Sequence, residues 1–589
     1  MTRLFNDPTE FAGELRAGFL AANSSFVRGV EGGVVRARPS RPGRVSVVIG
    51  GGSGHYPAFA GLVGPGLADG AAMGDLFASP SAHAVHSVAR AAENGGGVLL
   101  ACGNYAGDVL NFTAAADRLR ADGIDSRTVW VTDDISSASP AEREKRRGIA
   151  GGLIVYKVAS AAAEEGRSLD EVTIVARRAN DRTRSLGVAF GGCSLPGADA
   201  PLFTVPEGRM AIGMGIHGEP GIDEAPVPRA DELGALLVES LLAELPEDVG
   251  TPAGGRVLVV LNGLGSVKYE ELFVLFGSVA EAFAAAGVEL AFTEVGEFTT
   301  SFDMAGLSLT VCWLDEELER LWSAPASTPS YRTGPSVDGT SPERLPVPDH
   351  RPAASQHPSA ALADVVPAAS DASRVAARLV GEALEAARAT IDRHVDELGR
   401  LDAVAGDGDH GIGMQRGAVA AAAAAGDAIR RGAGAGTVLT RAGAAWADRA
   451  GGTSGMLWGL ILETLGAQVG DLDIPTTAQL AAGAAAAARR VQSTGGAAPG
   501  DKTMVDALVP FASTLTEKQQ LPLAVAWAAA VGAAETAAAA TADLLPRMGR
   551  ARPHAEKSLG HPDPGAYSFA LVVRAVGGAI DDSRTHSHG

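Results

Sequence analysis

The segment LDAVAGDGDHGIG, residues 401–413, carries Asp402, Asp407 and Asp409 in one short stretch interrupted by glycines. Carboxylates this close repel one another, so they are stable only when solvent or cations neutralise them. Mg²⁺ takes oxygen ligands and is commonly held by a few carboxylates together with substrate phosphates. The glycines let the backbone turn tightly and approach a ligand closely. The stretch predicts a Mg²⁺–nucleotide site, and a polar turn with aspartate caps is the alternative.

An EF-hand calcium loop does not fit this segment. Counted from Asp407, the sixth and twelfth positions are Ile412 and Ala418, where that loop requires glycine and glutamate.

A second glycine-rich stretch, Gly50–His55, follows the apolar run RVSVVI. It has neither the G-x-G-x-x-G spacing of a dinucleotide-binding loop nor the G-K-[ST] ending of a P-loop. Its bare backbone can still approach a small ligand closely, and His55 can act as an acid or a base near neutral pH. The alternative is a structural histidine that caps the following helix.

Two more stretches add candidate groups. CGNYAGDVLNF, residues 102–112, places Asp108 at a predicted loop–helix junction, where a plain N-cap is the alternative. GMGIHGEPG, residues 213–221, sets His217 among glycines, which leaves its ring accessible to a ligand. The alternative for His217 is a polar surface residue.

Composition limits the possible function classes. The 589 residues are 46% hydrophobic, which is enough for two to four domains with cores of their own. The net charge of −20 argues against a general binder of nucleic acid or of anionic membranes. Three scattered cysteines suit a reducing cytoplasm better than a disulfide framework or a zinc site. We expect no signal peptide and no membrane-spanning stretch of about 20 apolar residues.

Residues 1–325 have the pattern of an α/β domain. Short apolar runs bounded by turn residues alternate with helical stretches, which predicts largely parallel strands with ligands bound at their carboxyl ends. The predicted strands are Val45–Ile49, Val98–Ala101, Thr128–Val131, Val172–Ala176 and Val257–Leu261.

Residues 326–370 are rich in proline, serine and charge, and we predict an extended linker there. Residues 371–580 have helical periodicity and are rich in alanine. A helix bundle with its polar loops at one end would bring together the glycine-rich breaks of this region. Those breaks are GDGDHG, GGTSG, GGAAPGDKTM and GHPDPGA.

Taken together, these stretches resemble the dihydroxyacetone kinase family in its single-chain, ATP-dependent form. The resemblance covers nearly the whole chain apart from the linker. In the first domain it rests on GGGSGHYPAFAGLVG, GDLFASPSA, GNYAGDVLNF, RRGIAGGLIVYKVA, GMGIHGEPG and VGEFTTSFDMAGLSLT; in the second it rests on LDAVAGDGDHG, GGTSG, GDKTMVDAL and GHPDPGA.

The resemblance implies a first domain of two α/β subdomains that binds a short ketose. In the family a histidine nitrogen adds to the ketose carbonyl to give a hemiaminal, and His217 stands at that position. Such a bond selects ketoses over glycerol, which has no carbonyl group. Asp108 matches the base for the reacting hydroxyl, and His55 is expected to assist proton transfer. The sugar site is expected to be lined by Gly52, Ser53, Gly54 and His55.

The second domain resembles the family's all-α helical barrel for nucleotide. Asp402, Asp407 and Asp409 match its metal-binding aspartates, which imply two Mg²⁺ ions on the phosphates of ATP. The matching nucleotide-contact positions are His410, Gly411, Ile412, Gly413, Thr453, Ser454, Gly495, Met504, Arg550, Asp563, Pro564 and Gly565. The family also implies a homodimer in which the helical domain of one subunit can serve the other.

Three positions depart from the usual pattern of the family. Tyr56 and Phe59 replace a glutamate and a histidine, and Gly103 replaces a lysine. They resemble the branch that phosphorylates erythrulose, so we predict a tetrulose kinase with dihydroxyacetone as the alternative substrate. A phosphotransferase-linked kinase, a ketose-sensing regulator and a side activity that cyclises FAD are three further interpretations. The enantiomer of the ketose, the carbon phosphorylated and the oligomer size stay open.

Overall fold

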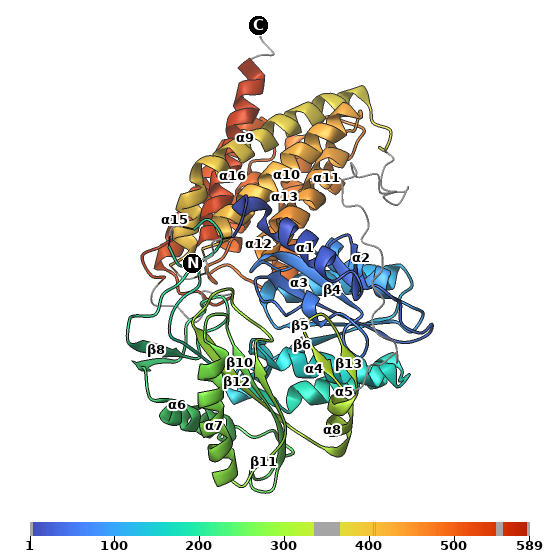
Figure 1. Ribbon diagram of the computed structural model, residues 1–589. Helices are drawn as coiled ribbons and strands as arrows, with labels where there is room; N and C mark the ends of the chain where they lie inside the picture. The colour runs from blue at the N-terminus through green and yellow to red at the C-terminus, as the bar shows by residue number, and fades with distance from the viewer. Residues whose placement is uncertain are drawn as a thin grey trace. The chain divides into compact units, whose positions relative to one another are not determined.

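The computed structural model describes residues 4–198, 200–334, 366–404, 406, 408–548 and 558–585. The chain divides into two compact units, Met1–Pro348 and Asp349–Gly589. The first is built from sheets and helices, and the second is built from helices (Figure 1). Among the predicted site residues, Asp407 and Arg550 lie outside the described residues.

The first unit contains two six-stranded sheets. The first sheet has the strand order β1-β2-β4-β3-β5-β6. Strand β3 pairs in parallel with β4 and β5, and β5 pairs in parallel with β6. β1, β2 and β4 pair in antiparallel fashion at the other side. The strands are β1 (Val27–Val30), β2 (Gly33–Arg36), β3 (Ser46–Ser53), β4 (Gly70–Leu76), β5 (Val98–Gly103) and β6 (Ser126–Val131).

The second sheet has the order β11-β10-β12-β7-β8-β9 and is mostly antiparallel. Among its described strands, only β10 and β11 pair in parallel, and the crossover helix α7 joins them. The prediction of largely parallel strands is therefore wrong for this sheet. Its strands are β7 (Thr183–Ala189), β8 (Arg209–Ile212), β9 (Asp223–Pro226), β10 (Arg256–Gly263), β11 (Glu289–Gly296) and β12 (Gly306–Trp313).

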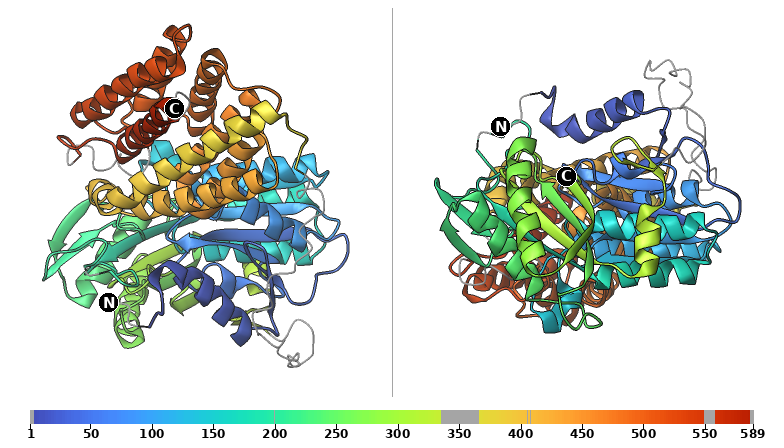
Figure 2. Two further views of the ribbon diagram at one scale, coloured as in Figure 1. Left: turned by 90° about the horizontal axis from the view of Figure 1, so that it is seen from above. Right: turned by 60° about the horizontal axis from the view of Figure 1, so that its bottom comes forward.

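Helix α4 (Gly151–Glu164) is the central helix of this unit, and it contacts strands of both sheets. Every residue from Gly151 to Ala163 is buried, which suits a helix that is apolar on all sides. The other helices are α1 (Phe11–Ala22), α2 (Ala82–Ala92), α3 (Ala106–Ala121), α5 (Leu169–Asp181), α6 (Ala230–Leu242), α7 (Tyr269–Ala285) and α8 (Glu316–Ser323). Figure 2 shows the same unit in two further views, with α1 in dark blue.

Residues Val172–Ala176, predicted to be a strand, lie inside helix α5. The capping box between Ser168 and Glu171 starts the helix. Its buried positions recur at helical spacing, so the apolar run is one face of a helix. Those positions are Leu169, Val172, Thr173, Val175, Ala176 and Ala179.

The first residues of the predicted linker fold back onto the first unit. β13 (Ala326–Ser327) pairs with β14 (Arg332–Thr333), and Tyr331 between them is buried in the core. Residues 335–365 lie outside the described residues.

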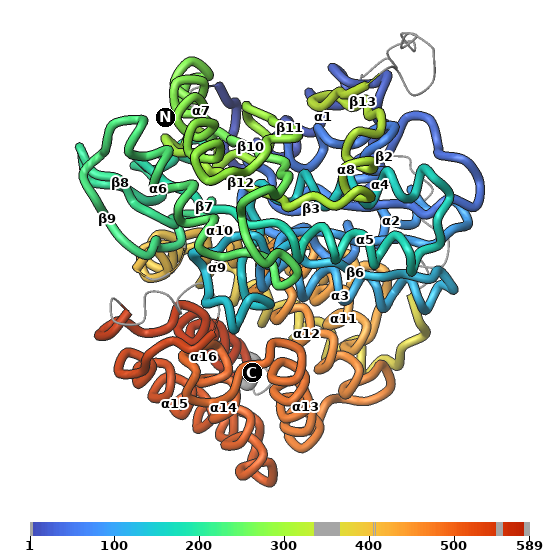
Figure 3. Tube along the Cα trace, turned by 90° about the horizontal axis from the view of Figure 1, so that it is seen from below, coloured from blue at the N-terminus to red at the C-terminus, as the bar shows by residue number. Residues whose placement is uncertain are grey.

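The described residues of the second unit form eight α-helices in a closed ring, as predicted for a helical barrel. Each helix contacts the next one in the chain, and α16 contacts α9. The helices α11 to α16 can be followed from orange to red in Figure 3. They are α9 (Asp371–Asp402), α10 (His410–Arg430), α11 (Ala435–Ala450), α12 (Gly452–Val469), α13 (Thr477–Gly495), α14 (Val505–Glu517), α15 (Leu523–Ala540) and α16 (Pro564–Thr585).

One stretch of the described chain, Leu523–Asp543, has the length and apolar composition of a membrane-spanning helix. It passes by length and composition only, because the many alanines of α15 raise its mean hydropathy, and helices of a protein core pass the same test. A third of its most apolar window, 33%, is buried inside the structure. Ala526, Ala530 and Ala534 belong to the core of the helical unit.

Candidate functional site

His55 and His217 lie in direct contact in the first unit. His55 follows strand β3, and His217 lies in the loop between β8 and β9. Their Nε2 atoms are 3.0 Å apart, and the two rings meet edge to face. Only 2% of His55 and 6% of His217 is exposed. The structure therefore joins two of the predicted site residues into one buried pair.

The outer nitrogen of each ring has an oxygen partner. Nδ1 of His55 donates to the carbonyl oxygen of Thr300 at 2.8 Å. Nδ1 of His217 lies 3.1 Å from Oε1 of Glu219, whose Oε2 accepts the backbone N–H of His217 at 3.0 Å. These bonds fix the plane of both rings and direct the two Nε2 atoms toward each other.

Aromatic rings surround the pair. Phe77 stacks on His55 with a centroid distance of 5.0 Å and meets His217 edge to face at 5.4 Å. Tyr105, the N-cap of α3, meets His217 at 4.8 Å. Phe302 packs against Phe77. Such walls exclude water from the facing nitrogens, so charges there interact more strongly than in solvent.

Phe77 and Phe302 both have positive φ angles, 53° and 56°, which non-glycine residues rarely adopt. Their backbone N–H groups donate to the carbonyls of Ser53 and Gly54, so they fix the loop on either side of His55. Strained residues persist only where surrounding contacts stabilise them, and they are concentrated at functional sites.

The glycines of the GGGSGH loop make this packing possible. A Cβ at Gly52 would lie 2.8 Å from the backbone of Phe77. Gly54 has a φ of +103°, and a Cβ there would lie 2.7 Å from the ring of Phe77. Bare backbone is thus needed at Gly52 and Gly54 to admit the aromatic wall. Ser53 donates its hydroxyl proton to the carbonyl of Gly74.

Asp108 lies in the first turn of helix α3, three residues beyond Tyr105, and is buried. Burial raises the pKa of the neighbouring Cys102 thiol well above its usual value, and the Asp108 carboxylate adds to this effect. Tyr105, at the N-terminus of the same helix, contacts His217, so the start of α3 lies beside His217.

The three positions that depart from the family pattern lie in different surroundings. Tyr56 is 46% exposed, shares a hydrogen bond with Ser330 and meets the ring of Phe19 edge to face. Phe59 packs over Gly51, where a Cβ would lie 2.2 Å from its ring. Gly103 ends β5, and a Cβ there would lie 3.1 Å from the ring of Tyr105.

Sequence reasoning missed several residues of this site: Phe77, Tyr105, Glu219, Thr300 and Phe302. Each stands inside a stretch that carried the family resemblance, and Glu219 follows His217 by two residues. That close spacing was the one local signal for Glu219. The aromatic residues gave none, because an apolar residue near a glycine loop is ordinarily part of the core.

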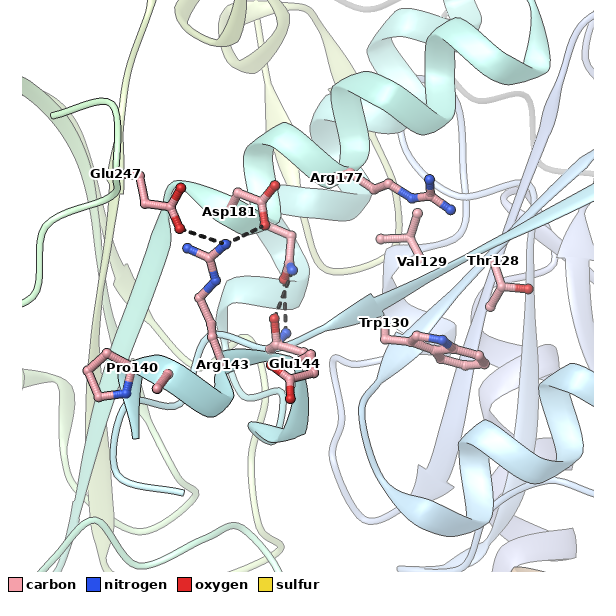
Figure 4. A pocket seen from close by; sticks show the side chains of 12 residues that line it. Thr128, Val129, Trp130, Pro140, Arg143, Glu144, Arg177, Asp181 and Glu247 are labelled. Atoms are coloured by element: carbon pink, nitrogen blue, oxygen red, sulfur yellow. Dashed lines mark hydrogen bonds and ion pairs between the residues drawn. The ribbon is translucent and has the colours of Figure 1, made fainter. Parts of the chain in front are cut away.

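A separate pocket of about 450 Å³ lies beside β6 and α5 (Figure 4). Inside it the guanidinium of Arg143 lies 3.5 Å from Asp181 and 4.0 Å from Glu247. These charges neutralise one another, and no predicted site residue is among those that line the pocket. The lining residues are Thr128, Val129, Trp130, Thr132, Pro140, Ala141, Arg143, Glu144, Arg177, Asn180, Asp181 and Glu247.

In the second unit, the described site residues lie at helix ends. Successive helices of a ring alternate in direction, so the loops α9–α10, α11–α12, α13–α14 and α15–α16 meet at one end. His410 joins three of these loops. Its Nε2 lies 2.9 Å from the Ser568 hydroxyl, its Nδ1 lies 3.3 Å from the Ser454 hydroxyl, and its N–H donates to Asp402.

The remaining described positions lie at the same helix ends. Asp402 is the last residue of α9, and Asp409 is the N-cap of α10. Gly411 packs α10 against α9, since a Cβ there would lie 2.1 Å from the carbonyl of Val395. The others are Ile412 and Gly413 in α10, Thr453 in α12, Gly495 at the end of α13, Met504 before α14, and Asp563, Pro564 and Gly565 at the start of α16.

Carboxylates are concentrated at this end of the ring: Asp506 is buried, and Asp402, Asp409 and Asp563 are half-buried. Burial, together with the charges of Asp402 and Asp506, raises the pKa of Asp563 to about 7, although its bond from the Ala566 N–H opposes this. Burial also lowers the pKa of His410. Lys502, which was not among the predicted site residues, donates to the carbonyls of Leu544 and Ser558.

The donors that this end offers suit a hard cation. Asp402 and Asp409 supply carboxylate oxygens, the ligand type that Mg²⁺ prefers. A bound cation would relieve the repulsion between Asp402 and Asp563. No group of three metal-ligating side chains is formed within the described residues, and the third predicted ligand, Asp407, lies outside them.

Comparisons with known proteins cover both units. The Dak1 domain matches residues 17–330, and the DAK2 domain matches residues 404–578. An L-erythrulose kinase from Pectobacterium atrosepticum is 57% identical over 100% of this chain and 98% of its own. A D-erythrulose kinase from Mycolicibacterium smegmatis is 54% identical over 98% of this chain and 99% of its own.

Among solved structures, the dihydroxyacetone kinase from C. freundii in complex with AMP-PNP and Mg²⁺ has a TM-score of 0.51 and 30% identity. The match covers 98% of this chain and 99% of that one. The chain therefore belongs to the dihydroxyacetone kinase family.

Proposed function

We propose that this chain is an ATP-dependent kinase that phosphorylates a terminal hydroxyl of erythrulose while the ketose is bound covalently to His217. The observation that carries this proposal is the buried His55–His217 pair, whose Nε2 atoms face each other inside aromatic walls. The full-length similarity to two erythrulose kinases supports the substrate class.

Capture of the ketose follows from the orientation of the pair. Nε2 of His217 adds to the carbonyl carbon, and the carbonyl oxygen takes a proton from Nε2 of His55. The product is a hemiaminal in which the sugar is fixed next to the start of α3. Polyols such as glycerol have no carbonyl group and cannot be captured in this way.

Asp108 is the proposed base for the hydroxyl that accepts the phosphoryl group. It is a buried carboxylate on the first turn of α3, next to Tyr105, which contacts His217. A carboxylate in hydrogen-bond reach of an alcohol can accept its proton as the new P–O bond forms.

The helical unit is the proposed nucleotide site. Asp402, Asp407 and Asp409 would hold two Mg²⁺ ions, and the ions would neutralise charge on the phosphate oxygens of ATP during transfer. The backbone N–H groups at the starts of α10, α12 and α16 suit phosphate oxygens, because helix N-termini favour anions. The other nucleotide-contact residues predicted from the family, including Arg550, are proposed to bind ATP.

Dihydroxyacetone is the second candidate substrate, favoured by the 30% identity to the C. freundii dihydroxyacetone kinase. Gly103 allows the Tyr105 ring, which contacts His217, to pack where a side chain would otherwise stand. The similarity to two erythrulose kinases over nearly the whole chain favours the larger four-carbon ketose. The deciding measurement is ADP release from Mg²⁺–ATP with D-erythrulose, L-erythrulose, dihydroxyacetone and glycerol. A catalytic efficiency on dihydroxyacetone far above that on either erythrulose would contradict the proposal.

The same assay distinguishes a kinase that uses free ATP from a phosphotransferase-linked kinase and from a sensor. Turnover only with a phosphorylated protein donor would indicate the phosphotransferase-linked mechanism, and ketose binding without turnover would indicate a sensor. Cyclisation of FAD would be a side activity of the helical unit. We further propose a cytoplasmic homodimer, and the three buried, free cysteines agree with a reducing compartment.

A further inference from the structure

We propose that Glu219 is a positioning residue for His217, which fixes its tautomer and stabilises the positive charge that the ring gains when a ketose adds to it. The inference rests on the proposed function, because it concerns the same capture step. It assigns to Glu219 a task that is separate from those of the two histidines.

Glu219 contacts His217 with both carboxylate oxygens, one on the backbone N–H at 3.0 Å and one on ring Nδ1 at 3.1 Å. Both side chains are buried, with exposed fractions of 5% and 6%. Gly215 leaves the space for this arrangement, since a Cβ there would lie 2.2 Å from Oε2 of Glu219. The short loop 215–219 is thus shaped around the carboxylate.

A cation lies next to Glu219 and favours the ionised form of its carboxylate. Nη1 of Arg147 lies 3.8 Å from Oε2 of Glu219, and Nη2 lies 2.9 Å from Asp134. Burial alone would lower the pKa of Arg147, but the carboxylates of Asp134 and Glu219 raise it above its usual value. Arg147 therefore stays charged between them.

The hydrogen bonds determine where the ring protons are. A carboxylate accepts, so Nδ1 of His217 carries a proton; a carbonyl accepts, so Nδ1 of His55 carries one too. In their neutral forms both rings would then present lone pairs from nitrogens 3.0 Å apart. One shared proton between the two Nε2 atoms resolves this repulsion, and the pair then carries one positive charge.

Ketose addition moves that charge. The bond between Nε2 of His217 and the carbonyl carbon forms, the C=O π bond breaks, and its electron pair takes the shared proton, which His55 releases. His55 becomes neutral, while His217 keeps its Nδ1 proton and becomes an alkylated imidazolium. The whole positive charge then lies 3.1 Å from Glu219. A buried ion pair of this kind favours the adduct over the free pair.

The groups that influence this step come from several elements. His55 follows β3, Tyr105 begins α3, and Arg147 and Asp134 flank the segment before α4. Burial raises the pKa of the Tyr105 hydroxyl well above its usual value, and the charge of Glu219 adds to this. Tyr105 thus stays neutral throughout, whereas Glu219 contacts the ring through its carboxylate.

The test compares wild type with Glu219→Gln and Glu219→Asp; the matched control is Glu224→Gln, an exposed glutamate five residues further on. Intact-mass spectrometry measures the erythrulose adduct against sugar concentration and pH. We expect roughly 10- to 100-fold weaker capture in Glu219→Gln, by analogy with the loss of a partner that orients a histidine. We also expect the alkaline limit of capture to move to lower pH. Glu219→Asp should recover part of the loss.

A second readout separates this inference from the proposed function. Nitrogen-15 spectra of the imidazole groups report which ring nitrogen of His217 is protonated, with or without a sugar adduct. We expect Nδ1–H in wild type and a mixture of tautomers in Glu219→Gln. The inference would be overturned if Glu219→Gln captured erythrulose as strongly as wild type, with the same pH profile and the same His217 tautomer. Absence of any adduct in wild type would overturn the proposed function, and the spectra would still decide the role of Glu219.

Discussion

The Nε2 atoms of His55 and His217 lie 3.0 Å apart, although 162 residues separate the two histidines in the chain. One comes from the end of a strand in the first sheet and the other from a loop of the second sheet. The site of the first unit is therefore assembled between its two sheets, and it depends on the packing that holds them together.

His217→Ala should abolish the ketose adduct and reduce ketose turnover by several orders of magnitude, because the proposed bond to the sugar forms on its Nε2. Nucleotide binding should be unchanged, since the predicted nucleotide-contact residues lie in the other unit. Intact-mass detection of the sugar and titration with ATP measure the two effects separately. Retention of the adduct in this variant would contradict covalent capture on His217.

Asp402→Asn should weaken Mg²⁺–ATP binding and leave sugar capture intact, because it removes one carboxylate from the proposed cation site. Asp396→Asn is the matched control, since Asp396 is an exposed aspartate on the same helix. Titration with ATP at several Mg²⁺ concentrations measures the effect. Equal affinity in both variants would mean that Asp402 is not a metal ligand. The same substitution at Asp407 is expected to act in the same direction.

Gly103→Ala tests whether space beside Tyr105 determines the substrate. The new Cβ would lie 3.1 Å from the Tyr105 ring, so this ring, which contacts His217, would have to shift. We expect catalytic efficiency to fall more for erythrulose than for dihydroxyacetone, because the larger ketose needs the room. The ratio of the two efficiencies is the measured quantity. Tyr56→Phe, at an exposed ring, should leave that ratio unchanged.

Gly54→Ala should destabilise the loop at His55 by roughly 1–3 kcal/mol, because alanine disfavours a φ of +103° and its Cβ would clash with Phe77. Gly43→Ala serves as a control for φ alone, since Gly43 has a φ of +78° and open space around it. Urea unfolding of both variants gives the two free energies. Equal losses would show that contact with Phe77 contributes nothing.

Lys157 makes stability depend on pH. Burial lowers its pKa from 10.5 to about 8, although the charge of Glu164 opposes this. Between these values the unfolded chain binds more protons than the folded one, so the free energy of unfolding should rise from pH 8 to 10.5. Below pH 8 both states carry the proton, and the full cost of burying the charge is present.

Lys157→Met should flatten that rise, whereas Lys145→Met, at an exposed lysine, should keep it. Denaturant unfolding at a series of pH values compares the three proteins. The same slope in Lys157→Met and in wild type would mean that Lys157 is charged in the folded state.

The sequence alone determined the helices of the second unit, the loops between them and the motifs of the family. The alanine-rich periodicity predicted helices α9, α10, α13 and α15, and the glycine-rich breaks between helices marked the loops that meet at one end of the ring. The order of the motifs along the chain identified the family, because each motif is a continuous segment that can be read directly from the sequence. Hydrogen bonds and periodicity within a segment depend mainly on the residues of that segment.

Only the tertiary structure decided relations between distant segments. The packing of the chain brings His55 into contact with His217 and places Phe77 against Phe302. It also makes the second sheet mostly antiparallel. Val172–Ala176 show the same limit, since an apolar run can suit a strand or one face of a helix until its burial is known. Such choices depend on long-range burial, which the sequence of a single segment does not contain.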